Sequence, residues 1–193
     1  MKKYLHIALM LLCVLAVTSC KDDNDDTAAV EQEAYKLEQE ALFQAKAGDT
    51  NYVKWNSEAN DGFVFAKLIK KGDGEQAYFN SRVSVYYKGS LTDGTVFSQW
   101  LFNEGDPSTY AVYSTYAGTV KDPVTGVSTT YGSVITGWTV ALQHMVVGDK
   151  YEVWIPQQLA YGATGKDNIL PYSTLIFEIE LVAVDQQAVS AGS

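Results

Sequence analysis

The sequence has few of the residues from which most metal sites and nucleic-acid surfaces are built. It contains only two cysteines and two histidines, and its 14 basic residues against 23 acidic ones give a net charge of −9. Zinc sites draw several ligands from cysteine and histidine, so no metal or cofactor is expected. Phosphate-backbone binding needs clustered lysine or arginine, and the sequence has no such cluster. Nucleic-acid binding is therefore excluded.

The first twenty residues have the pattern of an export signal. Lys2 and Lys3 are followed by an apolar run from Leu5 to Val17, which is short for a membrane span. The run ends in Val17-Thr18-Ser19-Cys20, which resembles the bacterial lipobox, where the cysteine is lipidated and becomes the mature N-terminus. We expect residues 1–19 to be a lipoprotein signal peptide and Cys20 to be the lipidation site. The alternative is an ordinary secretory signal with a chance cysteine.

Loss of residues 1–19 would narrow the possible chemistry further. One cysteine would remain, used for acylation, together with one histidine, His144. Disulfides and a cysteine nucleophile would be excluded, and a Ser-His-Asp triad would depend on His144 alone. The net charge would fall to −11 because Lys2 and Lys3 are lost. Anionic headgroups would repel such a body, so the acyl chains at Cys20 would have to hold it at the membrane.

Residues 20–50 are expected to form an acidic tether followed by an amphipathic helix. The tract Lys21–Asp26 cannot bury surface, and it resembles either the acidic export signal of surface lipoproteins or a plain spacer. Lys21 after the cysteine resembles outer-membrane sorting, with the periplasmic or surface face left open. From Thr27 to Lys46 the composition is helical, with apolar residues at helical spacing. These are Val30, Ala34, Leu37, Ala41 and Leu42. The helix is expected either to pack on the main domain or to pair two copies into a homodimer.

Residues 51–185 have the pattern of an α+β domain, and residues 186–193 that of a flexible tail. Thirteen tyrosines and an aromatic content of 12% favour β structure. Strands are predicted over residues 63–69, 82–91, 96–97, 150–155 and 174–184, with a short helix over 138–145. Mostly hairpin connections and one short helix indicate an α+β domain.

Five motifs in order along residues 63–184 resemble those of FKBP-type peptidyl-prolyl cis-trans isomerases. They are Val85–Phe97, Val134–Trp138 (the V-I-x-G-W pattern), Ala141–Asp149, Ile155-Pro156 with Leu159–Gly162, and Thr174–Leu181. The resemblance implies an antiparallel half-barrel sheet wrapped around a short helix, with a hydrophobic pocket between them. It also implies isomerisation of X–Pro bonds in polypeptide substrates, which are the expected partners.

The resemblance also implies which residues form the pocket. Trp138 would be the floor under the proline ring, and Tyr87, Phe97 and Phe177 would be aromatic walls. Val134 and Ile135 would line one side, with the Ile135 backbone N–H donating to a substrate carbonyl and the Tyr161 hydroxyl donating a second hydrogen bond. An apolar, dry pocket suits the reaction, because the twisted transition state has less charge separation than the planar amide.

The sequence departs from the family pattern at three places. Ser98 stands where the family usually has aspartate, so a charged hydrogen-bond acceptor is missing. The segment Lys166–Ser173 is about one residue shorter than usual, and Leu170 is expected to cap the pocket. Residues 113–133 form an insertion whose composition predicts an added β-hairpin beside the pocket, after Tyr110, which we also expect to contact substrate.

Three functions are consistent with these residues. The first is an isomerase held in the cell envelope by its lipid anchor and acting on folding or unfolded proteins. The second is a non-catalytic module that captures proline-containing segments, because Ser98 and the hairpin have removed turnover. The third is a surface lipoprotein that binds another ligand through the inserted hairpin, with the half-barrel as a scaffold.

Overall fold

The structure is a computed structural model that describes residues 24–113, 118–121 and 124–185. The predicted signal peptide, Cys20 and the tail at 186–193 lie outside the described residues. The chain divides into two compact units between Gln32 and Glu33. Within the described ranges, no helix is both long enough and apolar enough to cross a membrane.

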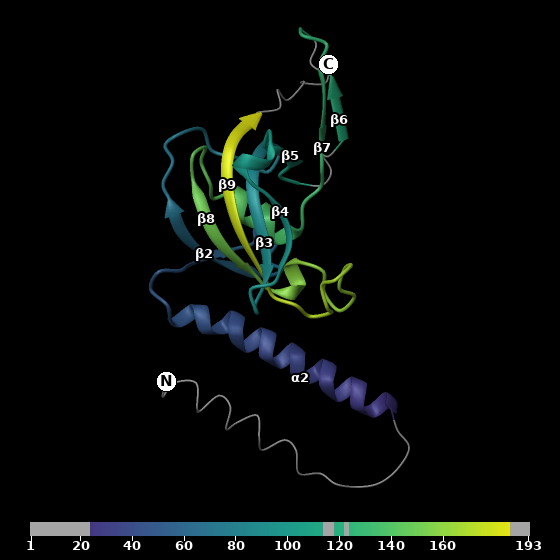
Figure 1. Ribbon diagram of the computed structural model, residues 1–193. Helices are drawn as coiled ribbons and strands as arrows, with labels where there is room; N and C mark the ends of the chain where they lie inside the picture. The colour runs from purple at the N-terminus through teal and green to yellow at the C-terminus, as the bar shows by residue number, and fades with distance from the viewer. Residues whose placement is uncertain (1–23, 114–117, 122–123, 186–193) are drawn as a thin grey trace. The chain divides into compact units, whose positions relative to one another are not determined.

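One antiparallel sheet forms the centre of the second unit. Its strands are β1 (Val53–Asn56), β2 (Phe63–Lys70), β3 (Arg82–Leu91), β4 (Val96–Trp100), β5 (Ser108–Ala111), β8 (Lys150–Ile155) and β9 (Leu175–Asp185). The order across the sheet is β1-β2-β8-β9-β3-β4, and β5 pairs with the beginning of β3. Strands β2, β8, β9 and β3 curve together in Figure 1. The predicted strands over 82–91 and 150–155 have the observed bounds.

Strict alternation decides which face of the sheet is buried. Along β9, Leu175, Phe177, Ile179 and Leu181 are buried, whereas the intervening glutamates lie on the opposite face. This is the pattern of a strand with one face on the core and one facing water. The predicted alternation of this strand is therefore confirmed.

The short helix α3 (Thr136–Leu142) packs against the buried face of the sheet. Every residue from Gly137 to Leu142 is buried. A Cβ atom on Gly137 would lie 2.3 Å from the Cγ2 atom of Ile155, so only glycine allows this close approach of helix to strand. The helix begins and ends earlier than the predicted range of 138–145, but Trp138, Leu142 and Met145 are all buried as their spacing indicated. The α+β fold, with the sheet around a short helix, is confirmed.

The N-terminal helix α2 (Asn24–Gln44) continues into a 3₁₀ turn at Ala45–Gly48. From Glu33 onward it belongs to the second unit, and it packs there through Gln39 and Phe43. Phe43 lies 5.0 Å from Phe65 between ring centroids, in a small aromatic cluster. The apolar residues that suggested the helix are not the ones it buries, because Leu37 remains exposed.

Gln39 is a polar residue buried at the contact between α2 and the domain. Its amide nitrogen donates to the Thr92 hydroxyl at 3.0 Å, and its amide oxygen accepts from the Thr174 backbone N–H at 3.1 Å. The Thr174 hydroxyl donates to the Gln39 carbonyl oxygen. These bonds satisfy the buried amide and fix the helix at the beginning of β9.

A separate hairpin lies within the inserted segment. Strands β6 (Gly118–Lys121) and β7 (Ser128–Tyr131) pair only with each other and extend away from the main sheet (Figure 1). The hairpin is joined to β5, because the Thr109 hydroxyl donates to the Thr130 carbonyl at 2.7 Å and the Gly132 N–H donates to the Thr109 carbonyl. After Gly132 the chain runs directly toward α3.

Candidate functional site

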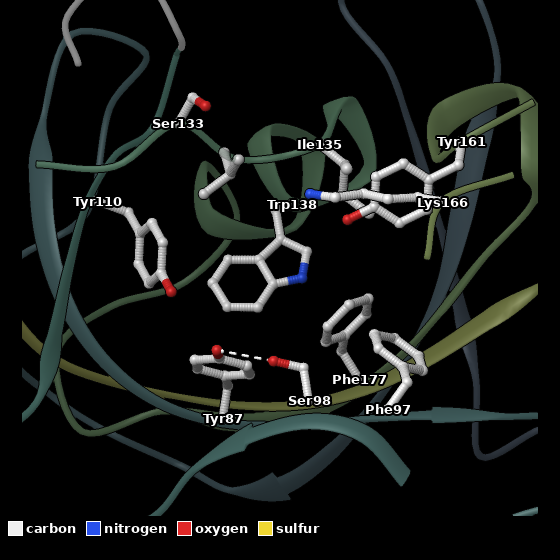
Figure 2. Close-up of a pocket in the computed structure, with 11 residues that line it drawn as sticks. Tyr87, Phe97, Ser98, Tyr110, Ser133, Ile135, Trp138, Tyr161, Lys166 and Phe177 are labelled. Atoms are coloured by element: carbon white, nitrogen blue, oxygen red, sulfur yellow. Dashed lines mark hydrogen bonds between the residues drawn. The ribbon is translucent and has the colours of Figure 1, made fainter. Parts of the chain in front are cut away.

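A pocket of about 370 Å³ lies between α3 and the concave face of the sheet. Eleven residues line it, and they come from β3, β4, β5, β9, α3 and two loops, as Figure 2 shows. They are Tyr87, Phe97, Ser98, Tyr110, Ser133, Val134, Ile135, Trp138, Tyr161, Lys166 and Phe177. The fold therefore brings together side chains that are up to ninety residues apart in the sequence.

Trp138 lies at the base of this pocket with 4% of its surface exposed. Three rings stand edge-on to its indole, with centroid distances of 5.3 Å to Tyr87, 5.5 Å to Tyr110 and 5.2 Å to Phe177. Edge-to-face packing at these distances is favourable and fixes the indole plane. The indole N–H is buried, yet it has no hydrogen-bond partner among the described residues. It points into the pocket (Figure 2).

Two phenylalanines close the opposite side of the pocket. Phe97 on β4 and Phe177 on β9 meet edge-to-face at 5.5 Å. Gly89 on β3 makes room for both, because a Cβ atom there would lie 2.6 Å from the Phe177 ring and 2.7 Å from the Phe97 ring. Position 89 requires glycine because of the packing of these two rings, not because of its backbone conformation.

The segment before α3 supplies the upper side of the pocket. Ile135 precedes the helix, and its backbone carbonyl accepts from the backbone N–H of Trp138 at 2.9 Å. The Ile135 N–H makes no hydrogen bond to any residue that the structure describes. It is thus a free donor beside Val134 at the pocket wall.

Hydroxyl groups give the pocket a polar edge. The Tyr87 and Ser98 hydroxyls are 3.0 Å apart, the one hydrogen bond drawn in Figure 2. Burial, and then the neighbouring Tyr87 hydroxyl, raise the pKa of Tyr110, so this phenol stays protonated at neutral pH. The Tyr161 ring is half-buried, with the Lys166 ammonium 5.3 Å from its centroid.

Nine of the ten pocket residues expected from the sequence line this pocket, and Leu170 does not. Its side chain is 57% exposed, whereas its neighbour Ile169 is buried in the core. Ser133 and Lys166 line the pocket without having been predicted. Ser133 immediately precedes the motif Val134–Trp138, and Lys166 is the first residue of the segment Lys166–Ser173 that departs from the family pattern.

No histidine, cysteine, aspartate or glutamate is among the described residues that line the pocket. His144 lies outside the pocket, where its ring stacks on Trp55 at 4.7 Å and its Nδ1 lies 2.8 Å from the Val140 carbonyl oxygen. No group of histidine, cysteine, aspartate and glutamate residues in the described ranges has the arrangement of a metal site. What the pocket offers is an aromatic surface with hydrogen-bond donors at its edge.

Residues 73–182 match the family of FKBP-type peptidyl-prolyl cis-trans isomerases. The chain belongs to this family of enzymes. It is 37% identical over 150 residues to an FKBP-type 22 kDa peptidyl-prolyl cis-trans isomerase of Escherichia coli, a match that covers 74% of this chain and 63% of that protein. It is also 37% identical over 123 residues to an outer membrane protein MIP of Legionella longbeachae, covering 63% and 44% of the two chains.

A solved structure of a peptidyl-prolyl cis-trans isomerase from Pseudomonas syringae superposes on this FKBP-type chain with a TM-score of 0.61 and 27% identity. The superposition covers 88% of this chain and all of the other. The chain spans less than two thirds of the length of these two curated relatives. The family and the fold that the sequence motifs implied are confirmed.

Proposed function

We propose that this chain catalyses cis/trans isomerisation of X–Pro bonds in polypeptides, in the pocket over Trp138. The observation that carries the proposal is the aromatic floor of the pocket. Trp138 is buried, with three rings standing edge-on around it, and it forms the base of a cavity that is open to a ligand. A flat, apolar surface of this kind fits the face of a proline ring. Membership of the FKBP family indicates that the reaction is isomerisation of the X–Pro bond.

The reaction needs desolvation and positioning rather than acid–base chemistry. Rotation about an X–Pro bond has a barrier of roughly 18–20 kcal/mol, because the amide loses its planar resonance. The twisted amide is less charge-separated than the planar one, so an apolar pocket stabilises the transition state relative to the ground state. The aromatic walls formed by Tyr87, Phe97 and Phe177 would supply that environment.

Hydrogen-bond donors at the edge of the pocket would hold the peptide in place. The unpartnered Ile135 N–H would donate to one substrate carbonyl and the Tyr161 hydroxyl to another. The buried indole N–H of Trp138 is a third donor that lacks a partner among the described residues. Because an unpaired buried donor costs about 1–3 kcal/mol, a bound carbonyl or water that accepts from it would contribute to binding.

A prolyl isomerisation assay on short X–Pro peptides tests the proposal. The full-length chain, purified in a mild non-ionic detergent, would be compared with Trp138→Ala and Tyr161→Phe, and with Trp100→Ala and Tyr78→Phe as matched changes at exposed sites outside the pocket. We expect kcat/KM to fall more than tenfold for Trp138→Ala and several-fold for Tyr161→Phe, with the controls unchanged. A folded wild-type chain that accelerates no X–Pro peptide would exclude turnover and favour the non-catalytic binding module.

We also propose that the isomerase is held in the cell envelope by a lipid at Cys20, after removal of residues 1–19. The support is the apolar run before Val17-Thr18-Ser19-Cys20, together with similarity to a relative named as an outer membrane protein. Residues 20–50 would then be the tether and helix, and 51–185 the isomerase domain. Cys20→Ala should move the protein from the membrane to the soluble fraction; an unchanged membrane fraction would refute the anchor.

Pairing of two copies through the N-terminal helix remains a further proposal. Leu37 and Leu42 are exposed on the part of α2 that is packed on the domain, so they are available to a second copy. Sedimentation of the full-length chain in detergent, beside a variant carrying Leu37→Glu and Leu42→Glu, measures this directly. A dimer that the double variant dissociates is the expected result, and a wild-type monomer at high concentration would exclude pairing.

A further inference from the structure

Lys166 is the only charged side chain among the described residues that line the pocket. Its ammonium lies over the Tyr161 ring, 5.3 Å from the centroid, and it points into the pocket in Figure 2. Ser98 occupies the lining position where a carboxylate would otherwise be expected, so no lining acid can pair with the ammonium. In the described ranges Lys166 forms no ion pair of any kind.

The backbone of Lys166 is held in place, so its cation is presented from a fixed point. The Lys166 N–H donates to the Ile169 carbonyl at 3.0 Å, and the Ile169 N–H donates back to the Lys166 carbonyl at 2.8 Å. Ile169 is itself buried in the core. Only side-chain rotamers must therefore be ordered when the ammonium meets an anion. Asp167 is exposed and does not line the pocket.

We propose that Lys166 makes the pocket selective for polypeptides with a carboxylate side chain in a residue adjacent to the proline. This inference rests on the proposed isomerase function and names the substrate class of the same site. Lys166 lies over the Tyr161 ring, so a peptide whose carbonyl accepts from the Tyr161 hydroxyl would bring its neighbouring side chains close to the ammonium. A glutamate or aspartate there completes an ion pair that the protein leaves open.

The overall negative charge of the protein does not reverse this preference at ordinary ionic strength. The formal charge of −9 is spread over the whole sequence, whereas the substrate carboxylate would sit within a few ångströms of Lys166. At about 0.15 M salt the Debye length is about 8 Å, so distant acidic groups are screened much more than this contact. The preference should therefore persist near physiological salt and weaken as salt rises further.

The test measures kcat/KM for a matched set of amide-capped peptides on the full-length chain in non-ionic detergent. The set varies one residue before the proline, and then one residue after it, among glutamate, glutamine and lysine. Because an exposed ion pair contributes little, we expect glutamate to exceed glutamine by about two- to fivefold in at least one of the two positions, with lysine below glutamine. Lys166→Gln should bring the glutamate-to-glutamine ratio to one, and Lys166→Glu should invert it.

Lys70→Gln is the matched control, because it removes the same charge from an exposed ion pair with Glu180, away from the pocket lining. Its glutamate-to-glutamine ratio should equal that of the wild type. Equal rates for glutamate and glutamine in the wild type, or a ratio that Lys166→Gln leaves unchanged, would overturn the proposed role of Lys166. Neither result would affect the isomerase proposal. If no peptide is accelerated, the isomerase proposal fails, and titration of the same peptides by NMR then decides the binding preference separately.

Discussion

The hydroxyl of Tyr87 on β3 lies 3.0 Å from the hydroxyl of Ser98 on β4, and both groups line the pocket. Tyr87 also stands edge-on to Trp138, so this hydrogen bond orients one wall relative to the floor. A bond between two neutral hydroxyls is weaker than the charged one that an aspartate at position 98 would accept. The pocket therefore depends on ring packing more than on this polar contact.

Removal of the hydroxyl pair should lower activity modestly and non-additively. A hydrogen bond of this type is worth about 0.5–1.5 kcal/mol, so Ser98→Ala and Tyr87→Phe should each reduce kcat/KM by about two- to tenfold. Because each change removes the same bond, the double variant should be little worse than either single one. A double-mutant cycle of kcat/KM measures this, and fully additive losses would show that the bond has no role in catalysis.

Gly89→Ala should deform the pocket wall. The added methyl group would meet the Phe97 and Phe177 rings at well under 3 Å, and overpacking of this kind costs about 1–3 kcal/mol. We expect a lower melting temperature together with a larger than tenfold loss of kcat/KM. Gly94→Ala is a contrasting change, because nothing lies within 4 Å of its added carbon and its positive φ of 90° brings backbone strain alone. Its catalytic loss should be much smaller.

Gln39→Ala should destabilise the domain. The change leaves the buried Thr174 N–H without its acceptor, and an unpaired buried group costs about 1–3 kcal/mol. Chemical denaturation would measure the free energy of unfolding. Gln44→Ala, at the end of the same helix, gives a comparison for the loss of a glutamine. A Gln39→Ala variant as stable as the wild type would mean that the hydrogen bonds of Gln39 contribute nothing to the stability of the domain.

Alkaline pH should destabilise the fold through Tyr52. Burial raises the pKa of Tyr52 above its ordinary value of 10.0, and the hydrogen bond that its hydroxyl donates to Glu152 raises it further. Above pH 10 the unfolded chain loses this proton first, so the folded state binds more protons and the free energy of unfolding falls as pH rises. Below pH 10 the contribution is fully present.

Denaturant titrations at pH 8, 10 and 11 check this expectation. Tyr52→Phe should lose less stability between pH 10 and 11 than the wild type does. Tyr78→Phe, at an exposed tyrosine, should follow the wild type. If the free energy of unfolding fell equally with pH in Tyr52→Phe and in the wild type, the loss of stability at alkaline pH could not be assigned to this residue.

The inserted hairpin should matter for long substrates more than for short ones. Val124 and Val127 near its turn are 90% and 61% exposed, and its base is joined to β5 next to Tyr110. We expect replacement of Gly118–Tyr131 by a short glycine-serine linker to leave kcat/KM on tetrapeptides within about twofold. The same change should slow catalysed refolding of a proline-limited protein several-fold. Equal effects on both substrates would indicate a tolerated insertion, whose closure entropy is small.

The sequence was most informative where a side-chain pattern repeats along one strand. The alternation in β9 and the bounds of β3 and β8 depend on which face meets the core, a property that consecutive residues carry themselves. The aromatic pocket residues were expected instead from the resemblance to the FKBP family, whose motifs this chain carries. Which of these side chains lie next to one another depends on the order of the strands in the sheet.

Two features could not be predicted because they depend on local backbone geometry and on distant partners. Between Tyr161 and Ser173 the chain adopts positive φ at Gly162, Gly165, Asp167 and Tyr172, and in this segment Lys166 rather than Leu170 lines the pocket. The second feature is the face of α2 that meets the domain, since its aliphatic residues indicated a helix that either packs on the domain or pairs two copies. The structure buries Gln39 instead, because hydrogen bonds to Thr92 and Thr174 satisfy its amide.

The bond between Gln39 and Thr174 joins residues 135 positions apart, and this has a consequence for biosynthesis. A ribosome adds about 5–20 residues per second, so roughly 7 to 27 seconds pass between synthesis of the helix and synthesis of its partner strand. During that interval Gln39 lacks the Thr174 N–H that donates to its amide oxygen, whereas Phe43 can already meet Phe65, which is made only 22 residues later. The aromatic contact of α2 is therefore available well before the hydrogen bond that fixes the helix at the beginning of β9, and the surroundings of Gln39 are completed only by the last strand of the domain.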